Sequence, residues 1–197
     1  MTLSVTPLSG EDARGVLADL GRLRQTVFRA YPYLYDGDAA YEEAYLRTYL
    51  DAPGSLIVVA RDGDRVVGAS TATPLAGEMP DVRAPFERAG EDVHAVLYFG
   101  ESVLLPEYRG RGLGHAFFDA REAHARTLGK PTTAFCAVVR PDDHLRRPAD
   151  YTPLDAFWTR RGYAPRADLR GTMTWRDLDE AAPTPKPMQF WVRTAPY

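Results

Sequence analysis

The first part of the chain alternates between apolar and polar residues with two different periods. Residues 2–8 change character at nearly every position, which predicts a short strand. From Ser9 onward, apolar residues recur every three to four positions, the spacing of a helix that buries one face. The residues with this spacing are Val16, Leu20, Leu23 and Val27. We therefore expect a strand followed directly by an amphipathic helix.

The next stretch predicts a second helix and a hairpin. Residues 39–50 fit a helix that ends before a Pro-Gly pair. Residues 55–61 and 65–74 are rich in β-branched and apolar residues, and an Asp-Gly-Asp turn separates them. The Gly- and Pro-rich residues 77–92 are expected to form a loop with one helical turn at 84–89.

The second half of the chain predicts a crossover unit. A strand over residues 95–105 leads into a glycine-rich loop, a helix over 115–128 and a buried strand over 132–139. Strand, loop, helix and strand in this order form a right-handed crossover between parallel strands.

A last helix is expected over residues 152–161, and two strands over 172–177 and 188–193. Together, the pattern predicts one α/β domain over residues 1–197. Its mixed sheet has helices on both faces.

Composition and charge narrow the class of protein. Apolar residues make up 45% of the 197 and charged residues 26%, as in ordinary folded domains. The 24 basic and 27 acidic residues give a net charge of −3, which does not favour binding to nucleic acid. Cys136 is the single cysteine, and no apolar run reaches the roughly 18 residues that cross a bilayer. We expect a cytoplasmic protein without a membrane or nucleic-acid partner.

The glycine-rich loop has the composition of an anion site. It reads Arg109-Gly110-Arg111-Gly112-Leu113-Gly114, with His115 opening the helix behind it. Glycines let successive backbone amides point at one place, and a helix N-terminus adds its positive dipole. The spacing differs from the nucleoside-triphosphate loop and from the dinucleotide loop. A tight strand-to-helix turn without a ligand is the alternative.

This stretch, read with the residues before it, resembles the central motif of the GNAT superfamily of N-acetyltransferases, whose signature is Q/R-x-x-G-x-G/A. Arg109, Gly112 and Gly114 stand at its three defining positions, and residues 157–163 are similar to the late helix end of that family. The resemblance implies a mostly antiparallel central sheet of about six or seven strands. It also implies that the parallel strands at 95–105 and 132–139 splay apart.

The resemblance further implies acetyl-CoA as the cofactor. Its pyrophosphate is expected on the loop from Arg109 to Gly114 and on His115, and its pantetheine arm on the backbone of Val103 and Leu105. Trp158 is expected at the same site, where the family commonly has a tyrosine. Because an indole N–H does not protonate a thiolate, Tyr151 or water is the expected acid.

Acetyl transfer to an amine requires removal of a proton, since an alkyl ammonium has a pKa near ~10. Glu101 is the expected base because it is the only carboxylate of the strand at 95–105. Tyr98 is the second candidate, and a bulge in this strand would decide which of the two faces the site. Cys136 is interpreted as a core residue rather than a nucleophile. The four histidines lack metal-ligand spacing, so no metal is expected.

Aromatic residues mark the expected acceptor side. Tyr31, Tyr33 and Tyr35 lie between the first two helices, which usually wall the acceptor site in this family. Together with nearby carboxylates they suit a cationic small-molecule or peptidyl amine. Three further tyrosines, at positions 41, 45 and 49, are more simply explained as a helix face packed on the sheet.

The expected activity is N-acetylation of a primary amine by direct transfer in a ternary complex. A catalytically weak acyl-CoA-binding or regulatory domain on the same fold is the alternative. O-acetylation and a longer acyl group also remain open. Many members of the family dimerise, so a homodimer is among the expected states.

Overall fold

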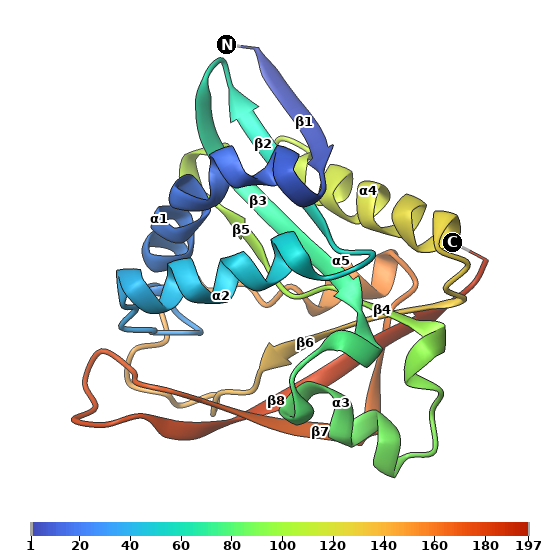
Figure 1. Cartoon of the computed structure of the whole chain (residues 1–197). Helices are drawn as coiled ribbons and strands as arrows, with labels where there is room; N and C mark the ends of the chain where they lie inside the picture. The colour runs from blue at the N-terminus through green and yellow to red at the C-terminus, as the bar shows by residue number, and fades with distance from the viewer. Residues whose placement is uncertain (1, 197) are drawn as a thin grey trace.

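The computed structural model describes residues 2–196, without the side chains of residues 39, 40 and 43. These residues form one eight-stranded sheet in the order β1-β2-β3-β4-β6-β8-β7, with β5 paired to β3 (Figure 1). Every pairing is antiparallel except that of β4 with β6. The strands are β1 (Leu3–Leu8), β2 (Leu56–Asp62), β3 (Arg65–Pro74), β4 (Val96–Tyr98), β5 (Ser102–Leu104), β6 (Thr132–Val138), β7 (Ala164–Trp175) and β8 (Thr184–Thr194). The predicted mixed, mostly antiparallel sheet is confirmed.

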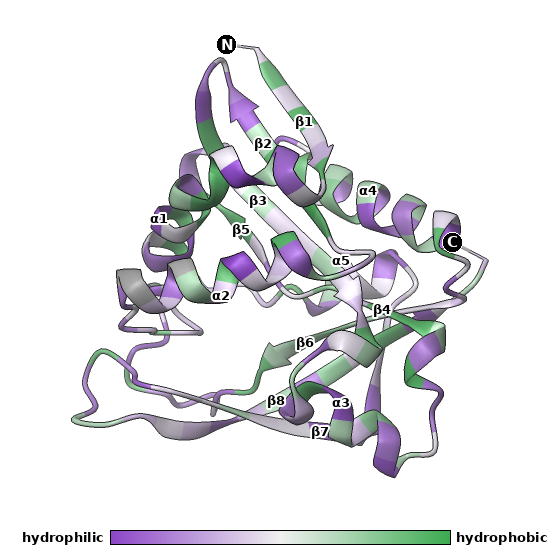
Figure 2. Cartoon of the chain, in the orientation of Figure 1, coloured by the Kyte–Doolittle hydropathy of each residue, from purple (hydrophilic) through white to green (hydrophobic). Residues whose placement is uncertain are grey.

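Helices cover both faces of the sheet, with α1 and α2 on one face and α4 on the other (Figure 1). The α-helices are α1 (Leu17–Phe28), α2 (Ala39–Asp51), α3 (Pro80–Arg88), α4 (Leu113–Thr127) and α5 (Asp155–Arg160). Short segments of 3-10 helix complete the set: η1 (Gly10–Val16), η2 (Leu75–Gly77), η3 (Val93–Ala95) and η4 (Pro106–Tyr108). Along α2 and α4, polar and apolar residues alternate, as expected for helices with one buried face (Figure 2). None of the described helices is long and apolar enough to span a membrane.

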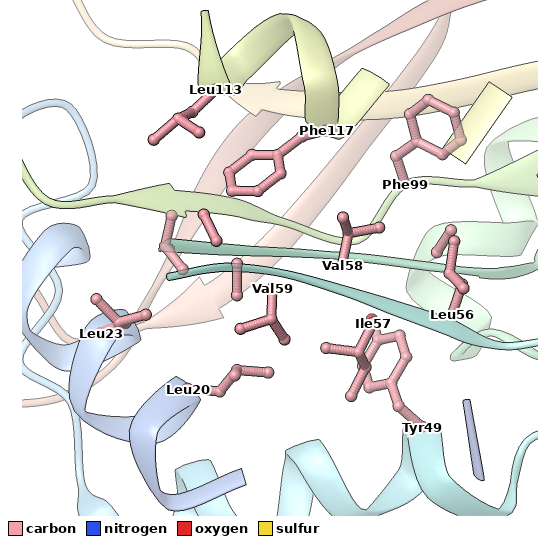
Figure 3. Packing of buried hydrophobic residues seen from close by; sticks show 14 of the residues in the cluster. Leu20, Leu23, Tyr49, Leu56, Ile57, Val58, Val59, Phe99, Leu113 and Phe117 are labelled. Carbon is pink, nitrogen blue, oxygen red and sulfur yellow. The ribbon is translucent and has the colours of Figure 1, made fainter. Parts of the chain in front are cut away.

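The core lies between the sheet and these helices. Successive residues of β2 point to opposite faces, so Ile57 faces α2 while Val58 faces α4 (Figure 3). Leu20 of α1 and Phe117 of α4 cover the two faces, and both are almost fully buried. Burial on both faces explains why β2 reads as a continuous apolar run.

The strand predicted over residues 95–105 is interrupted, and the interruption opens the sheet. β4 runs parallel to β6 as far as the Phe99 amide, which donates to the Ala134 carbonyl at 2.7 Å. Beyond it, β5 stays paired with β3 and does not pair with β6. The predicted splay of the two parallel strands is therefore confirmed.

Several boundaries differ from the expectation: the first helix begins as the 3-10 helix η1, α5 begins at Asp155 rather than 152, and β8 begins at Thr184 rather than 188. Three further differences have a physical reason. In place of the helical turn expected at 84–89, the structure has the nine-residue helix α3. Its Val82 and Phe86 are buried, but the helix is too short for the repeat of apolar residues to be recognised in the sequence. α4 begins at Leu113, two residues early, because Gly112 already takes the position before the helix. β7 begins at Ala164 rather than 172, since its polar first half and a register shift obscure the alternation.

Candidate active site

The glycine loop has the backbone geometry of an anion cradle. Gly110 and Gly112 have φ angles of 74° and 82°, a left-handed conformation that glycine adopts without steric cost. A Cβ at either position would meet nothing within 4 Å, so both face open space. Gly112 precedes α4 and gives it no side-chain cap, which leaves the first amides of the helix to an external partner. The loop therefore fits a phosphate group.

Side chains around the loop add positive charge and hold it in place. Arg109 and Arg111 are exposed, and the Arg111 guanidinium lies 5.2 Å from the centre of the Tyr108 ring. The Tyr108 hydroxyl donates to Asp62 at 3.0 Å, which ties η4 to the end of β2. His115 is exposed, and its ring stands edge-on to Phe157 of α5 at 4.9 Å. Arg109 to Gly112 and His115 thus form one exposed cationic edge, whereas Leu113 of the predicted loop is buried in the core.

A shallow hollow of about 500 Å³ lies beside this edge, between α4, α5 and the end of β8. Its charged groups are largely paired with each other. Arg161 donates to Asp119 at 2.7 Å and to Glu122 at 2.8 Å. These pairs explain the cluster as the attachment of α5 to α4.

The register of β5 determines which backbone groups face the opening. The Leu105 amide donates to the Val67 carbonyl at 3.0 Å, and the Glu101 carbonyl accepts from the Thr71 amide at 3.1 Å. Backbone groups alternate in direction along a strand, so Val103 also faces β3. Ser102 and Leu104 face the opening instead. This moves the backbone expected to hold a pantetheine arm by one residue from Val103 and Leu105.

Trp158 fills the far side of the opening with an aromatic stack. Its ring lies 5.0 Å from Phe135 of β6 and 5.1 Å from Trp191 of β8. The indole is half-buried and offers packing area rather than a proton.

The interruption between β4 and β5 is held from both faces of the sheet. On the α4 face, the buried Arg121 donates to the carbonyls of Thr71 and Glu101 at 3.4 and 3.3 Å. Its cation lies 4.3 Å from the centre of the Phe99 ring. Burial lowers the pKa of Arg121 to about 10. Gly100 lies within this interruption, which we call the bulge. These contacts therefore fix the chain at the point where it leaves β6.

On the opposite face, Glu101 belongs to a buried ionic network. Arg24 of α1 forms ion pairs with both Glu101 and Glu42 of α2. The Tyr45 hydroxyl also donates to Glu101, at 3.1 Å. These contacts engage Oε2 of Glu101, while its buried Oε1 has no partner in the described structure. Glu101 therefore joins the interrupted segment between β4 and β5 to both α1 and α2.

Tyr98, the second candidate base, faces Cys136. Its hydroxyl lies 3.1 Å from the Cys136 sulfur. Burial, and then the neighbouring Cys136, raise the pKa of Tyr98 well above its usual value. Burial also raises the pKa of the Cys136 thiol to about 12. Both groups keep their protons at neutral pH, so neither is suited to act as a base or a thiolate nucleophile.

The structure brings Tyr31, Tyr33 and Tyr151 together at one side of the opening. The rings of Tyr31 and Tyr151 meet edge-on at 4.7 Å. Burial raises the pKa of Tyr33, and the neighbouring Cys136 and Tyr151 raise it further. Tyr35 instead turns toward Glu42. Burial is the main cause that raises the pKa of Tyr35, and Glu42 is the next. It therefore lies apart from the other two predicted acceptor residues.

Arg140, which the sequence did not single out, fastens the tyrosine-bearing loop to the sheet. Its guanidinium donates to the carbonyls of Pro32 and Tyr33 at 2.7 and 2.8 Å. It also forms a bidentate pair with the buried Asp177, at 2.7 and 3.0 Å. The connection between α1 and α2 is thus attached to the end of β6 and to the β7–β8 connection.

Glu78 is a second residue that sequence reasoning missed. It lies in the turn after β3, and its carboxylate is partly buried against α2. Burial raises its pKa, the Met79 amide lowers it, and Glu101 raises it again. Its sequence context is one loop that also holds Glu87 and Glu91. In the sequence, Glu78 differs from these two glutamates only because it follows the end of a predicted strand. That position alone is a weak indication of function.

Comparisons with known proteins agree with this arrangement. The ribosomal-protein-alanine N-acetyltransferase of Brucella melitensis has 13% identity and a TM-score of 0.63, with 98% of this chain and 99% of that chain covered. The yncA protein of Salmonella typhimurium, solved with its cofactor acetyl-CoA, has 11% identity and a TM-score of 0.61, with 98% and 94% covered. An acetyltransferase of Thermus thermophilus has 15% identity and a TM-score of 0.60, with 99% and 98% covered.

At these identities the solved structures show the fold alone. The sequence matches no curated protein. The profile described as "Acetyltransferase (GNAT) family" matches residues 20–147, which is more than half of the chain. The glycine loop, the splayed strands and this match agree, and the chain belongs to the acetyltransferase (GNAT) family.

Proposed function

We propose that this protein is an acetyl-CoA-dependent N-acetyltransferase that moves the acetyl group to a primary amine by direct transfer in a ternary complex. The observation that carries the proposal is the opening between β5 and β6. The uncapped start of α4 follows β5, and buried carboxylates and tyrosines lie on the opposite face of the sheet. An anionic donor and a cationic acceptor can thus reach one opening from different sides.

On the donor side, the chain binds and orients. The amides from Gly110 to Gly114 and the charges of Arg109 and Arg111 would hold the pyrophosphate. The backbone of Ser102 and Leu104 would hold the pantetheine arm. Acetyl-CoA supplies the activated acetyl thioester when bound. Holding amine and thioester in contact accounts for much of the rate of such a transfer.

On the acceptor side, the chain handles protons. Tyr31 and Tyr33 would wall the amine. The pKa of Tyr151 is raised by burial and then by Tyr31, so its hydroxyl stays protonated and suits the role of donor to a leaving thiolate. Glu101 was the sequence-predicted base. Its ion pair with Arg24 favours a positioning role for it.

The test is a calorimetric titration of acetyl-CoA and CoA into wild type, Gly112→Asp and Gly129→Asp. Gly129 also has a positive φ, 63°, and open space around it, but lies at the other end of α4. Both changes impose similar backbone strain, and only Gly112→Asp places a carboxylate at the phosphate cradle. Binding lost in Gly112→Asp and kept in Gly129→Asp is expected.

Turnover with a panel of amines then tests transfer itself. Acetylated amine together with released CoA is the expected product pair. Binding of acetyl-CoA without turnover of any amine would favour an acyl-CoA-binding or regulatory domain. No binding to the folded wild type would refute the proposal.

A further inference from the structure

A cavity of about 150 Å³ lies on the face of the sheet that α2 covers. It is enclosed by the C-terminal half of α2, the end of β3 and the turn that leads to α3. Six of its lining residues are Tyr45, Thr48, Tyr49, Thr73, Glu78 and Met79. Met79 is half exposed, at 52%, and marks the mouth of the cavity.

Two lining residues of this cavity, Thr73 and Tyr49, contact the segment where the sheet opens. Thr73 is paired with Tyr98, so both side chains point to the same face of the sheet. The Tyr49 hydroxyl approaches Gly100 so closely that a Cβ there would collide with it. A molecule in the cavity would therefore be separated from the interruption between β4 and β5 by these two side chains alone.

Glu78 is the only carboxylate among the lining residues, and its charge is uncompensated. Within the described part of the chain, no cation lies at ion-pair distance from it, and its carboxylate accepts a hydrogen bond from the Met79 amide at 3.2 Å. Glu101, by contrast, is paired with Arg24. After burial, the charge of Glu78 also raises the pKa of Tyr49, Tyr98 and Cys136. Glu78 thus acts electrostatically on groups of α2, β4 and β6, and it lines the cavity together with Tyr49 of α2.

We propose that this cavity binds the ammonium group of the acceptor amine, with Glu78 as its counter-ion and as the base that takes its proton. The inference rests on the proposed acetyl transfer to an amine. One proton moves from the ammonium nitrogen to a Glu78 oxygen and then to solvent. The nitrogen lone pair forms the C–N bond as the C–S bond breaks, and a second nitrogen proton ends on the leaving thiolate sulfur, which becomes the thiol of CoA.

The lining also indicates the class of amine. Tyr45 and Tyr49 give the cavity an aromatic lining, and the Tyr45 ring already attracts one cation, Arg24, at 4.4 Å. The ionised form of the Glu78 carboxylate would become more favourable if an ammonium paired with it. None of the lining residues is basic, so a carboxylate next to the reacting amine would be left unpaired. The site therefore suits an alkyl ammonium rather than an α-amino acid.

The kinetic test compares Glu78→Gln with Asp81→Asn. Asp81 is an exposed carboxylate three residues away, on the first turn of α3, and serves as the matched control. We expect Glu78→Gln to lower kcat/KM for an alkyl amine at pH 7 by about 10²–10³-fold. Its remaining activity should rise with pH only as the free amine accumulates, so the acid limb of its pH profile should follow the pKa of the amine instead of the lower pKa expected for the wild-type base. Acetyl-CoA affinity should be unchanged, and Asp81→Asn should match wild type.

A binding test separates this inference from the proposed activity. Thermal shifts are measured with saturating CoA and with n-butylamine, n-butanol or norvaline. Wild type should be stabilised by butylamine alone, and Glu78→Gln by none of the three. That result would support the ammonium site even if no amine were acetylated.

Two results would overturn the inference. One is a Glu78→Gln protein with the kinetics of Asp81→Asn, and the other is a butylamine shift that persists in Glu78→Gln. If Glu78→Gln does not fold, Glu78→Asp replaces it. A displaced acid limb in Glu78→Asp would support a proton-accepting role, and an unchanged limb would refute it.

Discussion

Replacing Arg140 with methionine should loosen the acceptor side of the molecule while leaving the donor side intact. The change keeps much of the side-chain volume and removes the guanidinium that binds two carbonyls of the α1–α2 connection and Asp177. Arg140 and Asp177 are 8% and 5% exposed in their side chains, so the lost pair is a buried one. The loop would keep the bond from the Trp175 indole to the Tyr33 carbonyl.

The expected magnitude follows from the groups left behind. Breaking a buried ion pair by removing one partner costs about 3–5 kcal/mol. Lys186 lies 3.6 Å from Asp177 and would compensate part of its charge, so the low end, about 3 kcal/mol, is expected. For a chain of this size that corresponds to a fall in Tm of about 6–12 °C. Because the loop carries Tyr31 and Tyr33, KM for the amine should rise about tenfold.

The assay combines thermal unfolding, acetyl-CoA titration and steady-state kinetics. Arg166→Met is the control, since Arg166 pairs with Glu91 and Asp168 at the exposed surface and such pairs contribute little. We expect the control to match wild type in all three measurements. A Tm of Arg140→Met equal to that of the control would refute the reasoning. Loss of acetyl-CoA affinity with an unchanged amine KM would refute the assignment of the loop to the acceptor side.

Two further outcomes follow from the buried tyrosines and the bulge. Gly100→Ala should lower stability by about 1–3 kcal/mol, because the new methyl group would meet the Tyr49 hydroxyl and lie 2.7 Å from Thr71 Oγ1. Adding Tyr49→Phe should recover part of the loss in urea unfolding, and no recovery would contradict the steric explanation. Burial raises the pKa of Tyr33 and Tyr163 above the value near ~10 of an unfolded tyrosine. Their contribution to stability is therefore complete below about pH 10 and is lost as the pH rises above it, which urea midpoints between pH 8 and 11 would show. A stability that increases through this range would contradict it.

Local patterns predicted the central unit of the fold well. The signals for this unit lie close together in the sequence: glycines, a helix that follows them and an apolar run on either side. The predicted ends of helices and strands differ from the observed ends where a terminal residue could belong either to the loop or to the element. Gly112, for example, could have stood inside the loop, but it directly precedes α4. β7 was recognised only from Thr172 onward, because Arg166 and Asp168 interrupt its alternation.

The acceptor side was less predictable because its contacts join distant parts of the chain. Glu101 was identified as chemically important from its place in a strand. Its partner Arg24 stands 77 positions earlier, and nothing near either residue indicates the pair. Arg140 reaches the carbonyls of a loop more than 100 positions away. The role of Glu78 depends on the cavity between α2 and β3, which exists only once these elements pack.

The distribution of charge around the opening explains why the two carboxylates should differ in function. On the acceptor face, Arg24 is already shared between Glu42 and Glu101, so the charge of Glu78 has no counter-ion in the described part of the protein. The donor face has the opposite polarity, with Arg109, Arg111 and the start of α4. The anionic phosphate and the cationic amine of the proposed reaction would therefore be attracted to different ends of one opening, and each would be disfavoured at the other. If Glu101 were the base, neutralising Arg24 would be expected to increase proton transfer, whereas with Glu78 as the base it should mainly weaken the attachment of α1 and α2 to the bulge. The Arg24→Met variant thus distinguishes the two assignments: with Glu78 as the base, KM for the amine should rise and the acid limb of the pH profile should move only slightly to higher pH, because Glu101 raises the pKa of Glu78 as the smallest of its causes.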